Sequence, residues 1–229
     1  MPYLGEPKPV KGTAQGDGFA VPFDKADEIV SPGYYEVTIM DGALNVKLTA
    51  SSRVAYHRYI RNSVEVNDNL GLILDLKSSA RSLLFRQGLQ DFTFSQLDDH
   101  TVAGFRKSDE WARDHKVYFA ARFNHPVLSV SGDGPVYNLN FGDQDYVDAR
   151  VSVSYSSIEG AVANLDAEKE ISFDDAVAHA VAQWSKELSK IEFRTAVPLV
   201  AVSRFPWIPI SPRAGIMNSR RVVPSESVS

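Results

Sequence analysis

The chain of 229 residues contains no cysteine. This absence excludes disulfide bonds, thiolate metal sites and cysteine nucleophiles. It does not identify a compartment, because exported and internal proteins alike can lack cysteine. Composition therefore leaves the localisation open.

Long apolar runs and a basic surface are also missing. No stretch of about 18 apolar residues occurs, and residues 1–18 hold three prolines and four glycines where a secretory leader would be basic and then apolar. The formal net charge is -5, whereas phosphate backbones are bound by clustered positive charge. We therefore expect no membrane span and no nucleic-acid partner.

Catalytic and metal-binding motifs are scarce. The histidines lack the spacing of zinc hydrolases, and no GxSxG or P-loop pattern is present. Glycoside hydrolysis needs two carboxylates roughly 5 to 10 Å apart. The acid pairs lie in expected turns or at a helix start, where solvated or capping roles explain them: Asp98/Asp99, Asp143/Asp145 and Asp174/Asp175. We predict no catalytic residue in this chain. We also predict no metal, since 143–148 lacks the glycine and distal glutamate of an EF-hand loop.

A β-hairpin is the clearest local signal. Residues 35–39 and 44–48 alternate apolar and polar side chains, and Asp41-Gly42 between them suits the two positive-φ positions of a type I′ turn. Further segments with period two follow at 53–59, 117–123 and 147–155, and residues 70–76 form a nearly continuous apolar run. Strands of this number and spacing predict a mainly β protein built as an antiparallel β-sandwich.

One amphipathic helix is predicted over residues 173–191. Apolar side chains gather on one face, Ser172 is a suitable N-cap, and acids in the first turn with lysines in the last complement the helix dipole. Proline-rich residues 1–32 predict an extended wrapping segment without regular ladders. Residues 192–229 predict an irregular tail, either out of frame or a divergent extension, because prolines interrupt every apolar run.

Four segments carry a resemblance to a known family. They are SPGYYEV, LTASSRVAYHRY, RKSDEWARDHKVYFAARF and VSYSSIEGAVANLDAE. In this order they resemble the amino-terminal domain of glycoside hydrolase family 92, the calcium-dependent exo-α-mannosidases, over residues 1–191. The resemblance implies a galactose-mutarotase-like sandwich over 33–172 and a linker helix over 173–191. It also implies that the carboxylates and calcium ligands belong to a helical catalytic domain that follows in the family, beyond the point where this chain stops.

Charged side chains crowd the segment that most resembles the family. Arg53, His57 and Arg58 would be costly in a core strand unless they were paired. We interpret them as candidates for pinning the sandwich against the catalytic domain. A satisfied network within the sheet is the alternative.

Aromatic side chains supply the carbohydrate candidates. Trp111 follows the charged run 106–110, a combination that suits stacking on a pyranose ring, although packing under a loop is the alternative. Tyr34 and Tyr35 could line a sugar cleft, but alternation turns one of them toward the core.

The sequence thus predicts the non-catalytic N-terminal β-sandwich of an α-mannosidase-like glycoside hydrolase, which binds mannose-containing glycans and packs on the catalytic domain. The alternative is a stand-alone carbohydrate-binding module. An active hydrolase that uses the acids of this chain is a third possibility. Calcium is expected for the full-length family enzyme and not for this chain.

Overall fold

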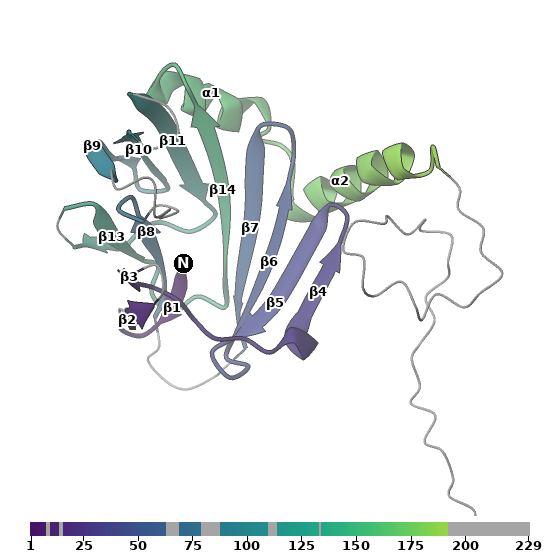
Figure 1. The fold of residues 1–229 in the computed structure, drawn as a ribbon, viewed down its shortest axis with the longest axis horizontal. Coiled ribbons are helices and arrows are strands. Elements are labelled where there is room, and N and C mark those ends of the chain that lie inside the picture. The colour runs from purple at the N-terminus through teal and green to yellow at the C-terminus, as the bar shows by residue number, and fades with distance from the viewer. Residues whose placement is uncertain are drawn as a thin grey trace, which may run out of the picture.

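The computed structural model describes residues 1–7, 10–13, 16–62, 69–78, 88–109, 114–132 and 134–191. They form three layers: a smaller sheet, a larger curved sheet and a pair of helices on the far side of the larger sheet (Figure 1). We call the helix-covered side of the larger sheet its outer face. The predicted antiparallel sandwich is confirmed, and the predicted tail over 192–229 lies outside the described residues.

The larger sheet has eight antiparallel strands in the order β4-β5-β6-β7-β14-β11-β10-β9. Their bounds are β4 Glu28–Ser31, β5 Tyr34–Ile39, β6 Leu44–Ala50, β7 Val54–Arg61, β9 Leu89–Asp98, β10 Thr101–Ser108, β11 His115–Phe123 and β14 Tyr146–Ser154. Strand β14 lies in the middle of the sheet although it is the last strand in sequence among the described residues.

The smaller sheet has the order β1-β8-β13-β12. Its strands are β1 Pro2–Leu4, β8 Leu70–Asp75, β12 Ser129–Ser131 and β13 Val136–Asn140. A separate two-stranded ladder joins β2 Val10–Thr13 to β3 Gly16–Gly18, and a 3-10 turn, η1, spans Lys25–Asp27.

The expectation that residues 1–32 form no regular ladders is wrong. Strand β1 pairs with β8 and β4 pairs with β5, and each lies at one edge of its sheet. Edge positions tolerate proline, and Pro2 is the first residue of its strand. The proline-rich segment therefore supplies an edge strand to both sheets.

The predicted hairpin is confirmed. Tyr35 pairs with Leu48 and Ile39 with Leu44. Both central turn residues have positive φ, 53° at Asp41 and 91° at Gly42, as a type I′ turn requires.

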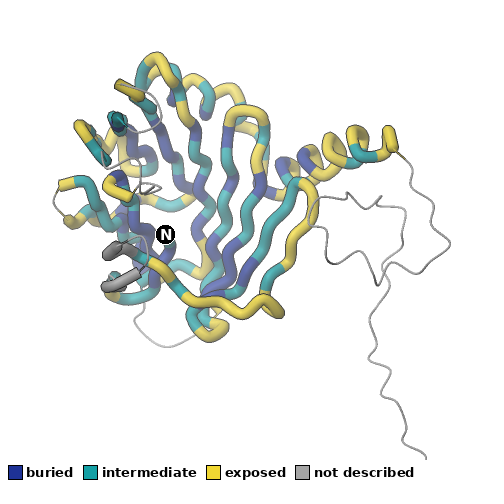
Figure 2. The backbone as a smooth tube through the Cα atoms, viewed as in Figure 1, coloured by how far each residue is buried: buried dark blue, intermediate teal, exposed yellow. Residues whose placement is uncertain are grey.

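The main core lies between the two sheets, where the central strands are buried (Figure 2). Strand β8 contributes Leu70 and Leu72, and the larger sheet contributes Val147 and Phe123 among others. The apolar run at 70–76, which was predicted to form a strand buried on both faces, contains β8, an interior strand of the smaller sheet.

A second core lies between the outer face and the helices α1 (Ile158–Ala167) and α2 (Phe173–Leu188). Helix α1 was not predicted. It packs on β14 and β11 and buries Ala161 and Leu165. Helix α2 confirms the predicted helix and its N-cap, because the Ser172 side chain accepts a hydrogen bond from the Asp175 amide at 3.1 Å. In the described ranges, neither helix has the length and apolar content needed to cross a bilayer.

Candidate functional site

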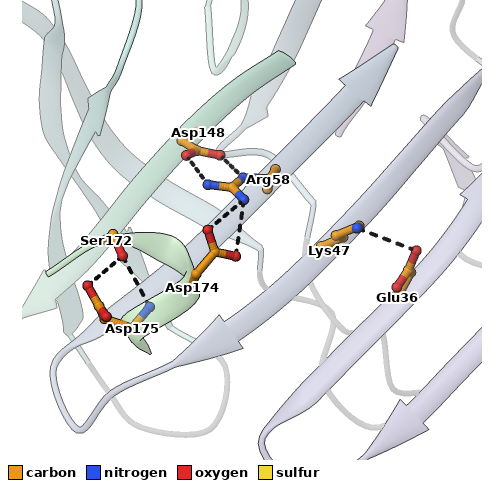
Figure 3. Close-up of polar contacts among 7 residues, drawn as sticks. All are labelled: Glu36, Lys47, Arg58, Asp148, Ser172, Asp174 and Asp175. Atoms are coloured by element: carbon orange, nitrogen blue, oxygen red, sulfur yellow. Dashed lines mark hydrogen bonds and ion pairs between the residues drawn. The ribbon is translucent and has the colours of Figure 1, made fainter. Parts of the chain in front are cut away.

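Arg58 on β7 ties the start of α2 to the outer face. Its Nε and Nη2 donate to the two carboxylate oxygens of Asp148 at 2.7 and 2.9 Å, and its Nη1 lies 3.2 and 3.3 Å from those of Asp174 (Figure 3). The guanidinium also lies 4.6 Å from the centroid of the Phe173 ring. Hydrogen bonding to Asp148 raises the pKa of Arg58. The Arg58 guanidinium is therefore paired with one carboxylate on β14 and with another on α2.

A row of charged side chains crosses four strands at the level of Arg58. The register places Glu36 beside Lys47, Lys47 beside Arg58, and Arg58 beside Asp148. Lys47 Nζ lies 3.9 Å from Glu36 Oε1, so the two central cations have acids on their outer sides (Figure 3). Cross-strand partners of opposite charge stabilise a sheet, whereas adjacent like charges do not. Glu36 and Asp148, at the two ends of the row, thus offset the repulsion between the neighbouring positive charges of Lys47 and Arg58.

Tyr34 and Tyr35 face opposite sides of the sheet, as alternation requires. The Tyr34 hydroxyl donates to Glu36 at 2.5 Å and its ring packs on the helix-covered core. Burial, followed by the hydrogen bond to Glu36, raises the pKa of Tyr34. The Tyr35 hydroxyl donates to Glu28 at 3.0 Å and its ring packs on the core between the sheets. The two tyrosines cannot line one cleft together.

His57 points away from Arg58, toward the core between the sheets. Its Nδ1 lies 2.7 Å from the Tyr59 hydroxyl. Burial, together with the positive amino terminus, lowers the pKa of His57 to about 4. The imidazole is therefore neutral at pH 7, and it is a half-buried group on the side of the sheet that faces the smaller sheet.

The five predicted site residues that the structure describes do not lie together, because Tyr34 and Arg58 face the helices whereas Tyr35 and His57 face the other sheet. Arg53 lies in the turn before β7, where its Nη1 donates to Asn164 Oδ1 at 3.1 Å. Trp111 lies outside the described residues. Tyr34 and Arg58 share the outer face, where the positive charge of Arg58 partly offsets the upward shift of the Tyr34 pKa. The predicted role of these residues at an interface remains a prediction.

A recess of about 320 Å³ opens between the outer face and the segment leading into α2. Its lining includes Arg58, Asn124, Asp148, Arg150, Lys169 and Phe173. Sequence reasoning missed Asn124, Arg150 and Lys169. The spacing of Asp148 and Arg150 on β14 was a usable signal, because residues two apart on a strand share a face. Mixed donors and acceptors beside an aromatic ring suit a small hydroxylated ligand.

The acid pairs have structural partners. Asp143 and Asp145 lie 2.6 and 3.5 Å from Arg61, and Asp98 accepts from the His100 amide at 2.8 Å in a turn. Within the part of the chain that the structure describes, no group of three or more histidine or acidic side chains is placed to hold a metal ion.

The contact between the β4–β5 turn and the middle of α2 is very close. Gly33 has φ +84°, and a Cβ added there would lie 2.9 Å from the Ala180 carbonyl carbon and 2.9 Å from the Val181 nitrogen. The Thr49 hydroxyl donates to the Gly33 carbonyl at 2.7 Å. The SPG part of the SPGYYEV segment therefore lets the helix rest directly on backbone.

Beyond this contact, the apolar side chains of α2 reach solvent. Phe173, Ala176 and Ala180 are buried, whereas Val181 is 38% exposed and Trp184 is 52% exposed. Ile191, just after the helix, is 79% exposed. The C-terminal half of α2 extends past the strands and is largely exposed (Figures 1 and 2).

Comparison with known families gives a match over most of the chain. The model of the glycosyl hydrolase family 92 N-terminal domain matches residues 1–197. The chain belongs to this family. The order of strands and helices described above is therefore that of a family 92 N-terminal domain, and the resemblance noted in the sequence is confirmed.

Solved structures agree in fold. The family 92 α-mannosidase BT3965 of Bacteroides thetaiotaomicron superposes with a TM-score of 0.70 at 20% identity, over 85% of this chain and 29% of that one. The family 92 inverting mannosidase BT2199 of the same species gives 0.64 at 21% identity, over 86% and 27%. This chain spans under a third of the length of either protein. No curated protein matched the sequence.

Proposed function

We propose that this chain serves as the non-catalytic β-sandwich domain of an α-mannosidase-like glycoside hydrolase, where it packs on a helical catalytic domain and contributes to binding mannose-containing glycans. Membership of family 92 supports the proposal. The two solved relatives are named as mannosidases, and most of each lies outside the matched region.

The exposed end of α2 carries the proposal. Val181, Trp184 and Ile191 expose large apolar side chains at the end of the helix. Isolated apolar residues are normal on a surface, but a group of them on one element marks an interaction site. A partner that covers them would remove their apolar area from water, which contributes roughly 25 cal/mol per Å².

Catalysis is assigned to the partner domain. Structural roles account for most of the described acid pairs: Asp143 and Asp145 pair with Arg61, Asp98 accepts a hydrogen bond in a turn, and Asp174 and Asp175 lie in the first turn of α2. In the proposed enzyme, calcium and the two carboxylates of hydrolysis come from the helical domain. The chain alone should therefore release no nitrophenol from an aryl α-mannoside, with or without added calcium.

Solution behaviour tests the packing role. The chain produced alone should self-associate through α2, and Trp184→Glu should shift it toward monomer in sedimentation velocity. Tyr155→Glu is the matched control, because Tyr155 is also an exposed aromatic residue, at 73% exposure, but lies outside α2. A monodisperse wild-type monomer in light scattering would contradict the proposed role of α2.

A stand-alone carbohydrate-binding module is the second candidate, and the recess beside Arg58 favours it. Calorimetry with methyl α-mannoside at millimolar concentration measures this binding directly. Loss of binding in Asn124→Ala would place the sugar in the recess, and loss in Trp111→Ala would place it at the tryptophan. No heat at millimolar ligand would exclude a module that acts alone.

A further inference from the structure

Arg150 on β14 is a half-buried cation that is not paired with a carboxylate. Its Nη1 donates to the backbone carbonyls of Glu168 and Lys169, at 3.4 and 2.7 Å. Within the described residues, it forms no ion pair, and its Nε and Nη2 have no hydrogen-bond acceptor. The carboxylate of Glu168 accepts instead from Ser51 and Tyr56, at 2.9 and 2.7 Å. The positive charge of Arg150 is therefore not neutralised by a bonded side chain.

Neighbouring arginines on the same face do have acidic partners. Arg58 lies 2.7 Å from Asp148, and Arg122 lies 2.8 Å from Asp166. Arg122 is also the residue directly opposite Arg150 in the pairing of β11 with β14. Like charges directly opposite one another destabilise a sheet, and charges taken out of water are normally paired. The two opposed arginines thus share one acid, and a bound anion would supply a second.

The open polar groups of the recess are mainly donors. Arg150, Asn124 and Lys169 all line it. Asn124 Oδ1 already accepts from the Asp148 amide at 2.8 Å, which leaves its Nδ2 as the open group. Lys169 Nζ lies 3.9 Å from Glu170 Oε1, beyond the length of a hydrogen bond. A ligand rich in acceptors would satisfy these groups.

The acids in the lining do not compensate Arg150. Both oxygens of Asp148 accept from Arg58 (Figure 3). The side chain of Glu170 is 88% exposed, so solvent screens its charge. The lining holds three cations, Arg58, Arg150 and Lys169, and only these two acids. One negative charge on a ligand would balance the set.

We infer that the recess binds a hydroxylated carboxylate of monosaccharide size, with the carboxylate on Arg150 and Lys169 and a hydroxyl on Asn124. The Nε and Nη2 of an arginine form a fork that matches the two oxygens of a carboxylate. Phe173 and Ile171 add an apolar wall, and a volume of about 320 Å³ is at the small end of ligand sites. The inference does not rest on the proposed function, because every group involved belongs to this chain.

Two ligands that differ in one group test the inference. They are methyl α-mannoside and the uronate of the same sugar, in which a carboxylate replaces the hydroxymethyl group. In calorimetry with the full chain, the uronate should bind about tenfold more tightly or better, and about 0.5 M sodium chloride should weaken only the uronate. Inorganic phosphate, which has charge but no ring, should bind about tenfold more weakly than the uronate. Equal affinity for the two sugars, phosphate binding as tight as that of the uronate, or no heat with millimolar uronate would each overturn the inference.

Substitutions in the lining identify the groups that bind the carboxylate. Arg150→Gln should weaken uronate binding by about tenfold or more and change methyl α-mannoside binding by less than about twofold, and Arg150→Lys should restore part of the loss. Arg150 also holds the loop before α2, so Lys169→Gln is a second test at a side chain that is 65% exposed. It should weaken uronate binding by about threefold with an unchanged Tm. Lys186→Gln, at an exposed lysine of α2 outside the recess, is the matched control. Uronate binding that survives both Arg150→Gln and Lys169→Gln would overturn the inference and leave the packing role standing.

Discussion

Replacing Gly33 with alanine measures how strongly the β4–β5 turn fixes α2. The substitution has two costs. Alanine at φ +84° is strained by roughly 1–2 kcal/mol. The added Cβ also meets helix backbone at 2.9 Å, which must move, and overpacking of this kind costs about 1–3 kcal/mol. The free energy of unfolding should therefore fall by about 2–5 kcal/mol.

Gly42→Ala is the matched control. Gly42 has a similar φ of +91°, but an added Cβ there meets nothing within 4 Å. The free energy of unfolding of this variant should fall only by the cost of backbone strain, roughly 1–2 kcal/mol. The gap of about 2 kcal/mol corresponds to about 4–8 °C in Tm for a chain of this size. Urea and thermal unfolding followed by circular dichroism give both numbers. Equal destabilisation of the two variants would refute the claim that Gly33 is required by the helix.

Substitutions at Arg58, His57 and Ser172 test the contacts around α2 and the core. Arg58→Ala should lower the free energy of unfolding by about 2 kcal/mol, because it leaves the half-buried Asp148 without its bidentate partner. Arg58→Lys should recover less than half of this loss in urea unfolding. An unchanged midpoint for either variant would refute the stabilising role of the Arg58–Asp148 pair. His57 is neutral in the folded protein, because burial lowers its pKa to about 4 from the 6.5 of an unperturbed histidine. Its contribution is therefore present above about pH 6.5 and is lost as the pH falls toward 4, by up to about 3 kcal/mol. His57→Gln should flatten this part of the stability–pH curve, and an unchanged slope would contradict the burial of the imidazole. Ser172→Ala should cost about 1 kcal/mol through loss of the N-cap, whereas Ser189→Ala, at the other end of α2, should cost less in the same unfolding assay.

Local signals predicted the hairpin and α2 correctly. The Asp41-Gly42 turn is specified by backbone preference alone, and α2 has both a cap and an apolar stripe within one continuous segment. Such features depend on neighbouring residues, so sequence reveals them. Helix α1 also has a cap, because the Ser157 side chain accepts a hydrogen bond from the Gly160 amide at 3.1 Å. With ten residues its apolar stripe is short, which makes the pattern harder to recognise in the sequence. Its stability comes from the sheet beneath it, as is usual for short helices.

The sequence predicted which side of the sheet the candidate side chains face, but it did not predict which residues they pair with. Alternation correctly separated Tyr34 from Tyr35, and the need to pair Arg58 was clear from its chemistry. The partner Asp148 is 90 residues away, on a strand whose place beside β7 depends on the sheet order. No local pattern encodes that order, so the Arg58–Asp148 pair and the recess became visible only in the structure.

The place of β14 has a consequence for the time course of folding. Strands β4 to β7 form one meander of sequence neighbours, and β9 to β11 form another. Only β14 joins them, through β7 on one side and β11 on the other. Loop closure between distant segments is slow, so the sheet cannot be completed until residues 146–154 have left the ribosome. Until then β7 and β11 are open edges with apolar side chains, and a nascent chain at this stage is most exposed to aggregation and most in need of a chaperone.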